Sequence, residues 1–478
     1  MKILFTGSPG TGKTFSMIKT IAEMLKNREI ETFKIITPTR VSKEAVLNAM
    51  LANDIFDENA VSTIHSFCFR KQEIKDVWTE DDDEIFYKKH NLKFIPGLGI
   101  IDFIYMPVGN RIDYVRRKII NETNKRVNEL KRNTALELIV KYSREALIFM
   151  KEEIVYQILI EREQIKESRD MIDFDDMILN ARDNVDEYDL IAVDESQTSS
   201  KFMLEYVKKI MKTKHFFATC DPTQAINPLS PELDYLMDFI RRFEKVEILK
   251  ENKRMAKNII EYVNKVYKRI NPIWEYTYSN IKGGEVRIVD YSNFIDVVDS
   301  VDVLITFSNE AIKRISTFLM DAGIPFLVRS GLEKVEKGIW DEEKIKLRDA
   351  LINFISKKAG FEELKLIAAY ANISLAPLEL SKLYNYSFSE IIGRIKSSNL
   401  IFGTALEKAV FSRRKPVTVS TVHSSQGLTF NSVLVYPKIT SYLRRTLNAY
   451  SATTWYGVAI TRERNKLFIL NASDSFVL

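Results

Sequence analysis

Short apolar runs alternate with segments of helical periodicity along the first half of the chain. Four mostly apolar runs pass directly into polar or glycine-rich sequence, at residues 2–6, 34–37, 190–193 and 216–219. The segments between them repeat apolar residues every three to four positions, as amphipathic helices do. Strands that alternate with helices form a parallel sheet and bind ligands at the carboxyl ends of the strands. The pattern therefore predicts an α/β unit.

A second α/β unit is predicted in the other half, starting near Val246. Its apolar runs lie at residues 246–249, 303–306, 323–326, 417–420, 433–436 and 466–470. Two stretches instead show helical periodicity with few breaking residues. We therefore expect a first unit (1–72 and 170–245) with a helical insertion (73–169), and a second unit (246–345 and 411–478) with a short helical insertion (346–410).

The composition is that of a globular protein in a reducing compartment. A chain of 478 residues, 45% hydrophobic and 28% charged, is too long for a single core. No apolar run approaches the about 18 residues of a membrane span, and the first strand begins too close to Met1 for a signal peptide. Only Cys68 and Cys220 are present, which argues against a disulfide framework and a zinc site. We expect a cytoplasmic protein without a membrane partner.

The net charge of +5 favours polyanionic partners only mildly. Residues 111–132 alone carry eight Lys and Arg side chains against three acidic ones, a balance of +5. A solvated helix face is the more common explanation of such a run. The charge distribution does not by itself establish nucleic-acid binding.

Residues 7–14, Gly-Ser-Pro-Gly-Thr-Gly-Lys-Thr, fit the P-loop pattern GxxxxGK[ST] between a predicted strand and a helix predicted over 15–27. In that context, backbone N–H groups surround phosphate oxygens at a helix N-terminus. Lys13 is expected to reach the terminal phosphates, and the Thr14 hydroxyl to bind Mg²⁺. The sequence therefore predicts a nucleoside triphosphate site formed by Gly7, Pro9, Gly10, Thr11, Gly12, Lys13 and Thr14.

Acidic residues follow the predicted strand at 190–193, where a P-loop enzyme needs them. Asp194 is predicted to hold Mg²⁺, and Glu195 to polarise the water that attacks the γ-phosphate. Gln224 follows the next strand, and its amide can contact both a water and a phosphate oxygen. The added Glu favours an enzyme of repeated hydrolysis over a kinase or a nucleotide switch.

Two arginines of the second half, Arg254 and Arg462, are candidates for arginine fingers. Such residues reach the γ-phosphate across a domain cleft and stabilise transition-state charge. Taken singly, a surface salt bridge is the more common explanation of each arginine. Their place in an ordered set of motifs makes them catalytic candidates.

The chain nearly repeats one short segment. Ser-Thr-Ile-His-Ser at 62–66 recurs as Ser-Thr-Val-His-Ser at 420–424, one copy in each half, and the copies use two of the four His residues. Two related domains that present equivalent polar loops to one linear ligand would explain the repeat. Chance similarity of five common residue types is the alternative.

Taken in order, these motifs resemble those of the UvrD/Rep-type superfamily 1 DNA helicases. The resemblance runs through 7–14, 37–45, 62–67, 173–176, 194–197, 220–224, 252–254, 323–326, 421–430 and 456–464. It implies two RecA-like P-loop domains, 1A and 2A, with ATP and Mg²⁺ between them. The insertions at 73–169 and 346–410 would be domain 1B and a reduced domain 2B.

The resemblance also implies how nucleic acid and nucleotide are contacted. Single-stranded DNA would lie across both domains and touch Thr39, Thr63, His65, Thr421 and His423, and Gly427 would belong to the nucleotide site. The expected activity is ATP-driven translocation with unwinding of duplex DNA, by a monomer that works with replication or repair proteins.

Several positions depart from the family pattern. Lys253 stands where a Tyr usually stacks on the base, Thr429 where a Glu usually contacts the ribose, and no Gln-containing segment precedes the P-loop. Pro38 and residues 425–429 look more like the RecD/Dda branch, which moves in the opposite direction. The polarity leans 3′ to 5′, with a 5′ to 3′ helicase, a translocase that does not unwind, and a P-loop kinase or switch as alternatives.

Overall fold

The computed structural model describes residues 1–69, 76–89, 161–162, 164–181, 187–226, 233–268, 277–329, 340–376, 380, 382–438 and 449–471. It divides into two compact units. Unit 1 comprises Met1–Asn252 and Ile273–Thr277, and unit 2 comprises Lys253–Pro272 and Tyr278–Leu478. The basic run at 111–132 and most of the insertion predicted at 73–169 lie outside the described residues.

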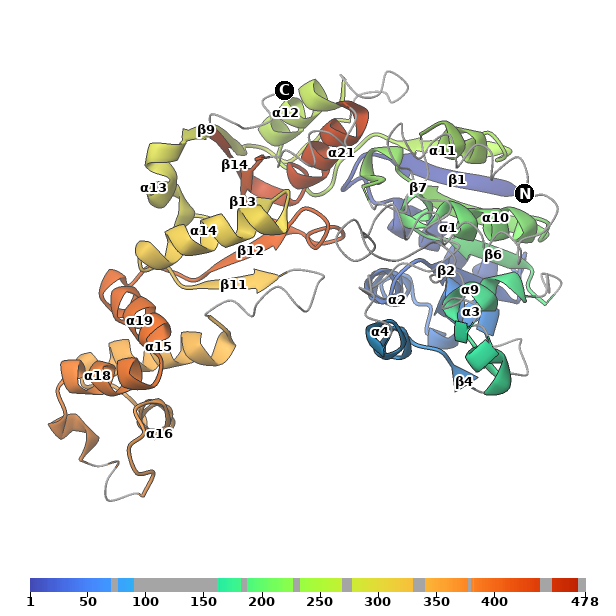
Figure 1. Ribbon diagram of the computed structural model, residues 1–478. Coiled ribbons are helices and arrows are strands. Elements are labelled where there is room, and N and C mark those ends of the chain that lie inside the picture. Colours follow the sequence, from blue (N-terminus) through green and yellow to red (C-terminus); the bar gives the residue numbers. More distant parts are fainter. Residues whose placement is uncertain are drawn as a thin grey trace. The chain divides into compact units, whose positions relative to one another are not determined.

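Unit 1 is built on a six-stranded sheet in which every neighbouring pair is parallel (Figure 1). The strand order is β3 (Val61–Thr63), β2 (Phe33–Thr37), β6 (Leu190–Val193), β7 (His215–Cys220), β1 (Lys2–Gly7) and β8 (Lys245–Leu249). A separate parallel pair joins β4 (Asp76–Val77) to β5 (Met171–Ile172), with α4 (Glu80–Lys89) beside it in sequence.

Helices cover both faces of this sheet, because successive strand residues point to opposite sides. Ile3 and Phe5 of β1 pack with α1 (Lys13–Lys26) and α2 (Arg40–Leu51) in one core. Leu4 belongs to the core on the other face. That second core contains α3 (Ile64–Phe69), α9 (Phe174–Leu179), α10 (Lys201–Ile210) and α11 (Leu233–Ile240).

Unit 2 contains a second six-stranded sheet, again parallel throughout. Its order is β11 (Phe326–Arg329), β12 (Val417–Thr421), β10 (Val303–Thr306), β13 (Phe430–Tyr436), β14 (Glu463–Asn471) and β9 (Glu285–Asp290). Its helices include α12 (Lys257–Tyr267), α13 (Phe294–Val298), α14 (Asn309–Asp321) and α21 (Ala449–Ala459). The two sheets confirm the predicted α/β class, with parallel sheets flanked by helices.

Helices occupy much of the described part of the range predicted as a short helical insertion. They include α15 (Glu342–Ile355), α16 (Phe361–Tyr370), α18 (Phe388–Ser398) and α19 (Leu400–Ser412). Their buried side chains form one continuous core with those of the second sheet. Arg348 of α15 strengthens this attachment, because its Nη2 donates to the carbonyl of Arg414 at 2.6 Å, just before β12. These helices therefore share the core of unit 2 and have none of their own.

The boundary expected near Val246 is wrong, because β8 is an edge strand of the first sheet. Leu249 pairs with Gly7 in a parallel register, and unit 1 continues to Asn252. Every residue of β8 is at least partly exposed, so its apolar pattern carried no sign of which sheet it would join. Unit 2 begins at Lys253.

Candidate nucleotide and nucleic-acid sites

The P-loop connects the end of β1 to the start of α1, as the sequence predicts. A Cβ atom on Gly7 would lie 2.4 Å from the carbonyl oxygen of Leu249, so only glycine fits there. Gly10 and Gly12 adopt φ of 88° and 82°, in the left-handed region that favours glycine. Thr11 is buried and donates to the Ser8 carbonyl at 2.9 Å, while the Pro9 carbonyl accepts from Asn252. The loop therefore has a defined backbone conformation.

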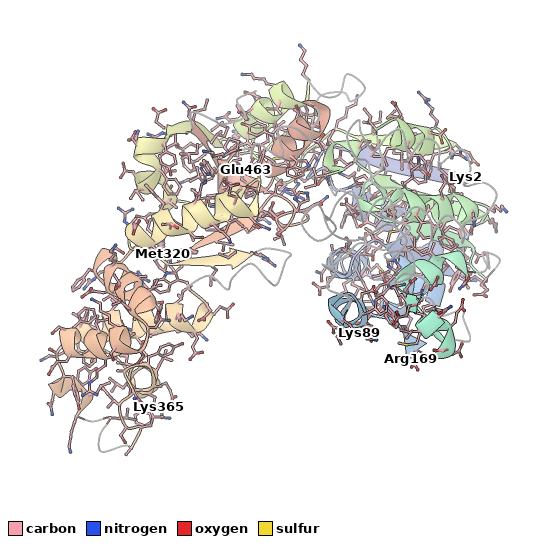
Figure 2. The ribbon with its side chains drawn as sticks, in the orientation of Figure 1. Lys2, Lys89, Arg169, Met320, Lys365 and Glu463 are labelled. Atoms are coloured by element: carbon pink, nitrogen blue, oxygen red, sulfur yellow. The ribbon has the colours of Figure 1, made fainter. Side chains whose placement is uncertain are left out.

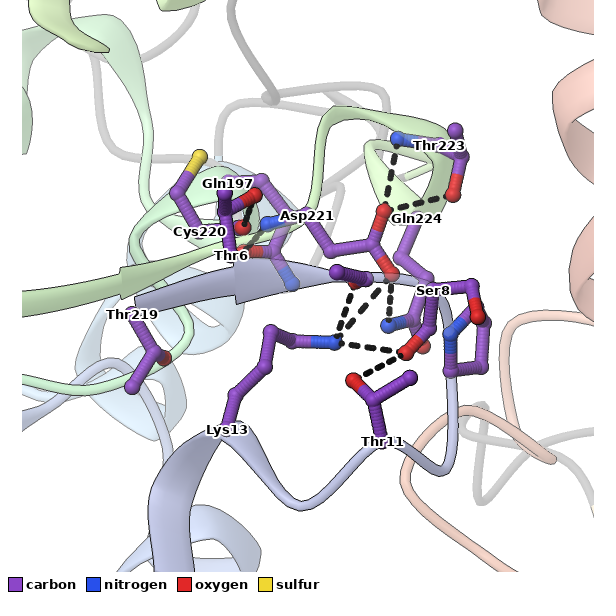
Figure 3. A network of polar contacts seen from close by, with 12 residues as sticks. Thr6, Ser8, Thr11, Lys13, Gln197, Thr219, Cys220, Asp221, Thr223 and Gln224 are labelled. Carbon is purple, nitrogen blue, oxygen red and sulfur yellow. Dashed lines mark hydrogen bonds and ion pairs between the residues drawn. The ribbon is translucent and has the colours of Figure 1, made fainter. Parts of the chain in front are cut away.

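Lys13 is the buried cation of this loop (Figure 3). Its Nζ donates to the carbonyls of Gly7 at 2.9 Å and Ser8 at 3.3 Å, and to Asp221 Oδ2 at 3.3 Å. The same Asp221 oxygen accepts from Gln224 Nε2 at 2.7 Å. Asp221 therefore brings the predicted residues Lys13 and Gln224 together at one carboxylate.

Thr14 and Asp194, the two predicted Mg²⁺ ligands, are in direct contact. Thr14 Oγ1 donates to the Asp194 carboxylate at 2.9 and 3.2 Å, and Thr219 Oγ1 donates to it at 2.7 Å. Burial and the neighbouring Glu195 raise the pKa of Asp194 to about 7, although both hydroxyls oppose this shift. A divalent cation would relieve that repulsion by binding the charged carboxylate.

The donor set fits Mg²⁺. A hydroxyl and a carboxylate within hydrogen-bond distance are hard oxygen ligands, and Mg²⁺ binds through one or two such groups, waters and substrate phosphates. Within the described part of the chain, no group of three His, Cys, Asp or Glu side chains could hold a metal by itself. Thr14 and Asp194 would therefore hold Mg²⁺ together with the phosphates.

Glu195 is held at the end of β6 by its backbone and by Gln197. Its φ of 51° is unusual for a residue other than glycine, and its N–H donates to Thr219 Oγ1 at 2.8 Å. Gln197 Nε2 donates to the Glu195 carboxylate, and Gln197 Oε1 accepts from the N–H of Asp221 at 2.9 Å. The buried Gln197 thus links the predicted water-activating carboxylate to the carboxylate that holds Lys13.

Arg254 and Arg462 meet at Thr461 in unit 2. Arg254 Nη1 donates to the Thr461 carbonyl at 3.3 Å, and Arg462 Nη2 donates to the Thr461 hydroxyl at 3.0 Å. Arg462 Nε also donates to the Val458 carbonyl at 2.9 Å, and only 1% of its side chain is exposed. The two candidate fingers are therefore neighbours, and Arg462 is one of the largest fully buried side chains described.

A buried carboxyl group lies beside these arginines. Glu463, labelled in Figure 2, follows Arg462 at the start of β14, and among the described residues no side chain donates a hydrogen bond to its carboxyl group. Burial raises the pKa of Glu463 to about 8, although Arg462 and Arg254 both lower it. Burial thus favours the neutral form of Glu463, whereas the two guanidinium groups favour its charged form.

We predict that Glu463→Gln has a higher free energy of unfolding than the original protein, and that the difference grows as the pH rises. The folded pKa exceeds the unfolded one, so the stability contributed by neutral Glu463 is complete below about pH 4.5 and is lost as the pH rises towards 8. At about 1.4 kcal/mol per pH unit, the free energy of unfolding falls by about 3 kcal/mol between pH 4.5 and pH 7, and a glutamine, which does not ionise, avoids this loss.

Urea unfolding at pH 5, 6, 7 and 8 measures the free energy of unfolding of both proteins. Glu285→Gln, exposed on β9, is the control, and equal pH profiles for Glu463→Gln and the original protein would contradict the prediction.

The repeated Ser-Thr-x-His-Ser segments share one hydrogen bond, although α3 follows Thr63 directly and turn residues follow Thr421. Thr63 Oγ1 accepts from the N–H of Ser66 at 3.3 Å, and Thr421 Oγ1 accepts from the N–H of Ser424 at 3.2 Å. Both threonines end a strand of a parallel sheet, β3 and β12. The repeat in sequence is therefore accompanied by an equivalent hydrogen bond at a strand end in each unit.

Each repeated histidine packs edge-on against an aromatic ring. His65 lies 5.1 Å from Phe174 and His423 lies 4.3 Å from Trp455, between ring centroids. Burial lowers the pKa of His65 to about 4, which Asp173 opposes. His65 is therefore neutral at physiological pH, and it could bind a phosphate only as a neutral hydrogen-bond donor.

The equivalence extends to the neighbouring strands. Thr37 Oγ1 donates to the carbonyls of Thr39 and Ser62, at 3.1 and 3.5 Å. Thr306 Oγ1 likewise donates to the carbonyls of Ser308 and Ser420, at 3.2 and 3.4 Å. The predicted DNA contact Thr39 is exposed and caps α2, as Ser308 caps α14.

Gly427 lies in the exposed loop after β12, with φ of 81° and open space where a Cβ would be. Its predicted part in nucleotide binding remains a proposal.

The sequence did not single out several residues of the nucleotide site. Thr219 was assigned to an apolar strand, yet its hydroxyl contacts both Asp194 and Glu195. Asp221 lies inside residues 220–224, one of the ranges that carry the family resemblance. Its position directly after a predicted strand could have marked it as a candidate for the nucleotide site. Thr306 and Ser308 could have been found from the shared Thr-x-Thr/Ser pattern before a helix.

Comparison with known proteins gives a family match in the first half of the chain. Residues 1–229 match the model of the AAA domain family, a range that includes the P-loop, Asp194 and Gln224. No curated protein matches the sequence.

Two solved structures of one helicase show a remote similarity. The arterivirus nonstructural protein 10 (helicase) is 12% identical, with a TM-score of 0.38 over 99% of this chain and 60% of that chain. Its complex with DNA is also 12% identical, with a TM-score of 0.39 over 99% of this chain and 61% of that chain. The present chain thus spans about three fifths of the length of that protein.

Proposed function

We propose that this protein is an ATP-dependent helicase of the UvrD/Rep type, which translocates on single-stranded DNA and unwinds duplex DNA. The repeated Thr-x-His segment carries the proposal, because it places equivalent polar groups at strand ends in two parallel-sheet units while only unit 1 holds a P-loop. An enzyme that translocates along a nucleic-acid strand needs one site of hydrolysis and two sites that bind the strand. A kinase or nucleotide switch has no need of the second segment.

The chemistry proposed for the nucleotide site follows from its contacts. Lys13 and the loop N–H groups would hold phosphate oxygens, and Thr14 and Asp194 would hold Mg²⁺, whose positive charge would neutralise negative charge on those oxygens. Glu195 accepts the proton of the attacking water, with Gln197 fixing its carboxylate. Gln224 contacts the γ-phosphate, and Arg254 and Arg462 neutralise its transition-state charge from unit 2.

ATP hydrolysis with and without a single-stranded DNA oligonucleotide tests the proposal. Stimulation by DNA, and its loss when Thr63 and Thr421 are both replaced by valine, would support it. Hydrolysis that is unaffected by DNA would contradict it and favour a switch or kinase. A strand-displacement assay separates a helicase from a translocase that does not unwind.

For the polarity we propose 3′ to 5′. Residues 173–176, Gln197 and residues 225–226 favour the UvrD branch, whereas Pro38 and residues 425–429 favour the RecD/Dda branch. Asp173 and Asp176 also form a capping box at α9, and Asp173 pairs with the buried Arg162. We predict unwinding of a duplex with a 3′ tail. Unwinding only from a 5′ tail would reverse the direction.

We predict weak discrimination between nucleotide bases, with Phe15 as the stacking residue. Tyr262 is hydrogen-bonded to Tyr456, and Tyr267 packs closely on Gly457, whereas Phe15 is 41% exposed two residues after Lys13. Stacking is worth about 1–3 kcal/mol, so Phe15→Ala should raise KM about 5- to 150-fold at similar kcat. Phe15→Trp should preserve KM.

Measurements of kcat/KM for ATP, GTP and CTP under saturating DNA check this. Phe56→Ala is the matched control, because Phe56 is exposed on unit 1 away from the P-loop in sequence. A preference for ATP above about 100-fold, or about 2.7 kcal/mol, would mean that another adenine pocket exists.

The family resemblance and the proposed activity imply a monomer that works with replication or repair proteins. No helix in the described ranges is long and apolar enough to cross a membrane. A cytoplasmic location remains part of the proposal.

A further inference from the structure

Three consecutive P-loop residues are contacted by residues far away in the sequence. The Leu249 carbonyl packs against Gly7, at the place where a Cβ would be. The Ser8 hydroxyl is hydrogen-bonded to the Thr277 hydroxyl at 2.6 Å. The Pro9 carbonyl accepts from Asn252 Nδ2, also at 2.6 Å. Ser8 and Pro9 are therefore each hydrogen-bonded to a side chain that lies outside the loop in sequence.

Asn252 and Thr277 are the residues at which the chain leaves unit 1. The first connection to unit 2 starts directly after Asn252, and the chain returns to unit 1 for residues 273–277. It leaves again directly after Thr277. Both connections that lead into unit 2 thus begin at a side chain hydrogen-bonded to the P-loop.

Asn252 and Thr277 are both buried, with 1% and 7% exposed, and the contact to Pro9 is buried while the contact to Ser8 is partly buried. A buried hydrogen bond is costly to break without replacement, so a movement of Ser8 or Pro9 displaces its partner. Arg254, a proposed catalytic arginine, follows Asn252 by only two residues. A change in the conformation of the P-loop therefore moves Asn252, and with it the segment that contains Arg254.

We propose that Asn252 and Thr277 are positioning residues that couple the conformation of the P-loop to the two connections leading into unit 2. Phosphate bound at Gly10–Lys13 fixes the loop, and the loop fixes the start of each connection. By reciprocity, DNA that changes the path of the connections changes the affinity of the loop for nucleotide. This inference rests on the proposed function, since it assigns a coupling route to the same nucleotide site.

The test measures the dissociation constant of a non-hydrolysable ATP analogue with and without a single-stranded oligothymidylate. The coupling ratio of the original protein should be about 5- to 150-fold. Asn252→Asp keeps the size but loses the amide donor to Pro9, and Thr277→Val keeps the shape but loses the hydroxyl. Both replacements should bring the ratio close to one.

Two controls separate coupling from a merely structural effect. Thr277→Ser retains the hydroxyl and should retain the ratio. Asn258→Ala removes an Asn that also donates to a backbone carbonyl, that of Gly284 at 2.9 Å, and should leave the ratio unchanged. Circular dichroism confirms that each variant is folded.

The outcomes distinguish the two proposals. If Asn252→Asp and Thr277→Val weaken nucleotide binding equally with and without DNA, the ratio is preserved and the coupling role is wrong. If the original protein itself shows a ratio of one, nucleotide and DNA are not linked, and the proposed function fails together with the coupling.

Discussion

Replacing Glu195 by Gln should lower kcat for ATP hydrolysis by about 10²- to 10⁴-fold, because the amide cannot accept a proton from the attacking water. The backbone should keep its position, since the N–H of residue 195 still donates to Thr219. Glu195 contributes to the raised pKa of Asp194, so its neutralisation favours a charged Asp194. Nucleotide affinity should therefore stay the same or increase.

Two measurements test this prediction. Single-turnover hydrolysis gives the rate of the chemical step, and equilibrium binding of a fluorescent ATP analogue gives the affinity. Glu205→Gln, an exposed change on α10, is the matched control and should preserve both values. Near-normal turnover in Glu195→Gln would exclude Glu195 as the group that activates water.

The parts of the site that the sequence predicted are those set by local chemistry. The P-loop needs residues of fixed type at fixed spacing, and Gly7 shows why, because a side chain there would collide with Leu249. Asp194 and Glu195 could be placed because a strand of four buried apolar residues precedes them. Such signals lie within a few residues of the groups they position.

Contacts between distant segments could not be predicted in this way. Thr277 follows no strand or motif, and only the fold shows that it reaches Ser8. The edge strand β8 was assigned to the wrong unit because its side chains alternate between exposed and half-exposed positions. The order of the strands, and the hydrogen bonds between segments that are distant in sequence, depend on the whole sheet.

Environments of buried polar groups were equally inaccessible from sequence. Arg462 was predicted as a catalytic group, but its almost complete burial follows from the packing of α21 and β14 around it. The burial of the Glu463 carboxyl group is also visible only in the fold. The burial of Arg462 determines how the second prediction must be tested.

Alanine at Arg254 or Arg462 should lower kcat by about 10³- to 10⁵-fold while changing nucleotide affinity far less, if both act as arginine fingers. Each guanidinium now donates to Thr461, through Nη1 of Arg254 and Nη2 of Arg462. The acceptors that Arg462 contacts on Val458 and Thr461 are neutral, and an ionised phosphate oxygen would be a stronger acceptor for the same cation.

Because Arg462 is buried, its loss could also act by destabilising unit 2. Arg348→Ala is the matched control, since Arg348 is 5% exposed and donates to the carbonyls of Ala409 and Arg414. It should lower stability without lowering kcat per folded molecule. Arg462→Lys adds a second readout, because lysine keeps the charge but cannot donate from a planar fork. A fall in affinity with unchanged kcat would show that these arginines bind the ground state and do not act in hydrolysis.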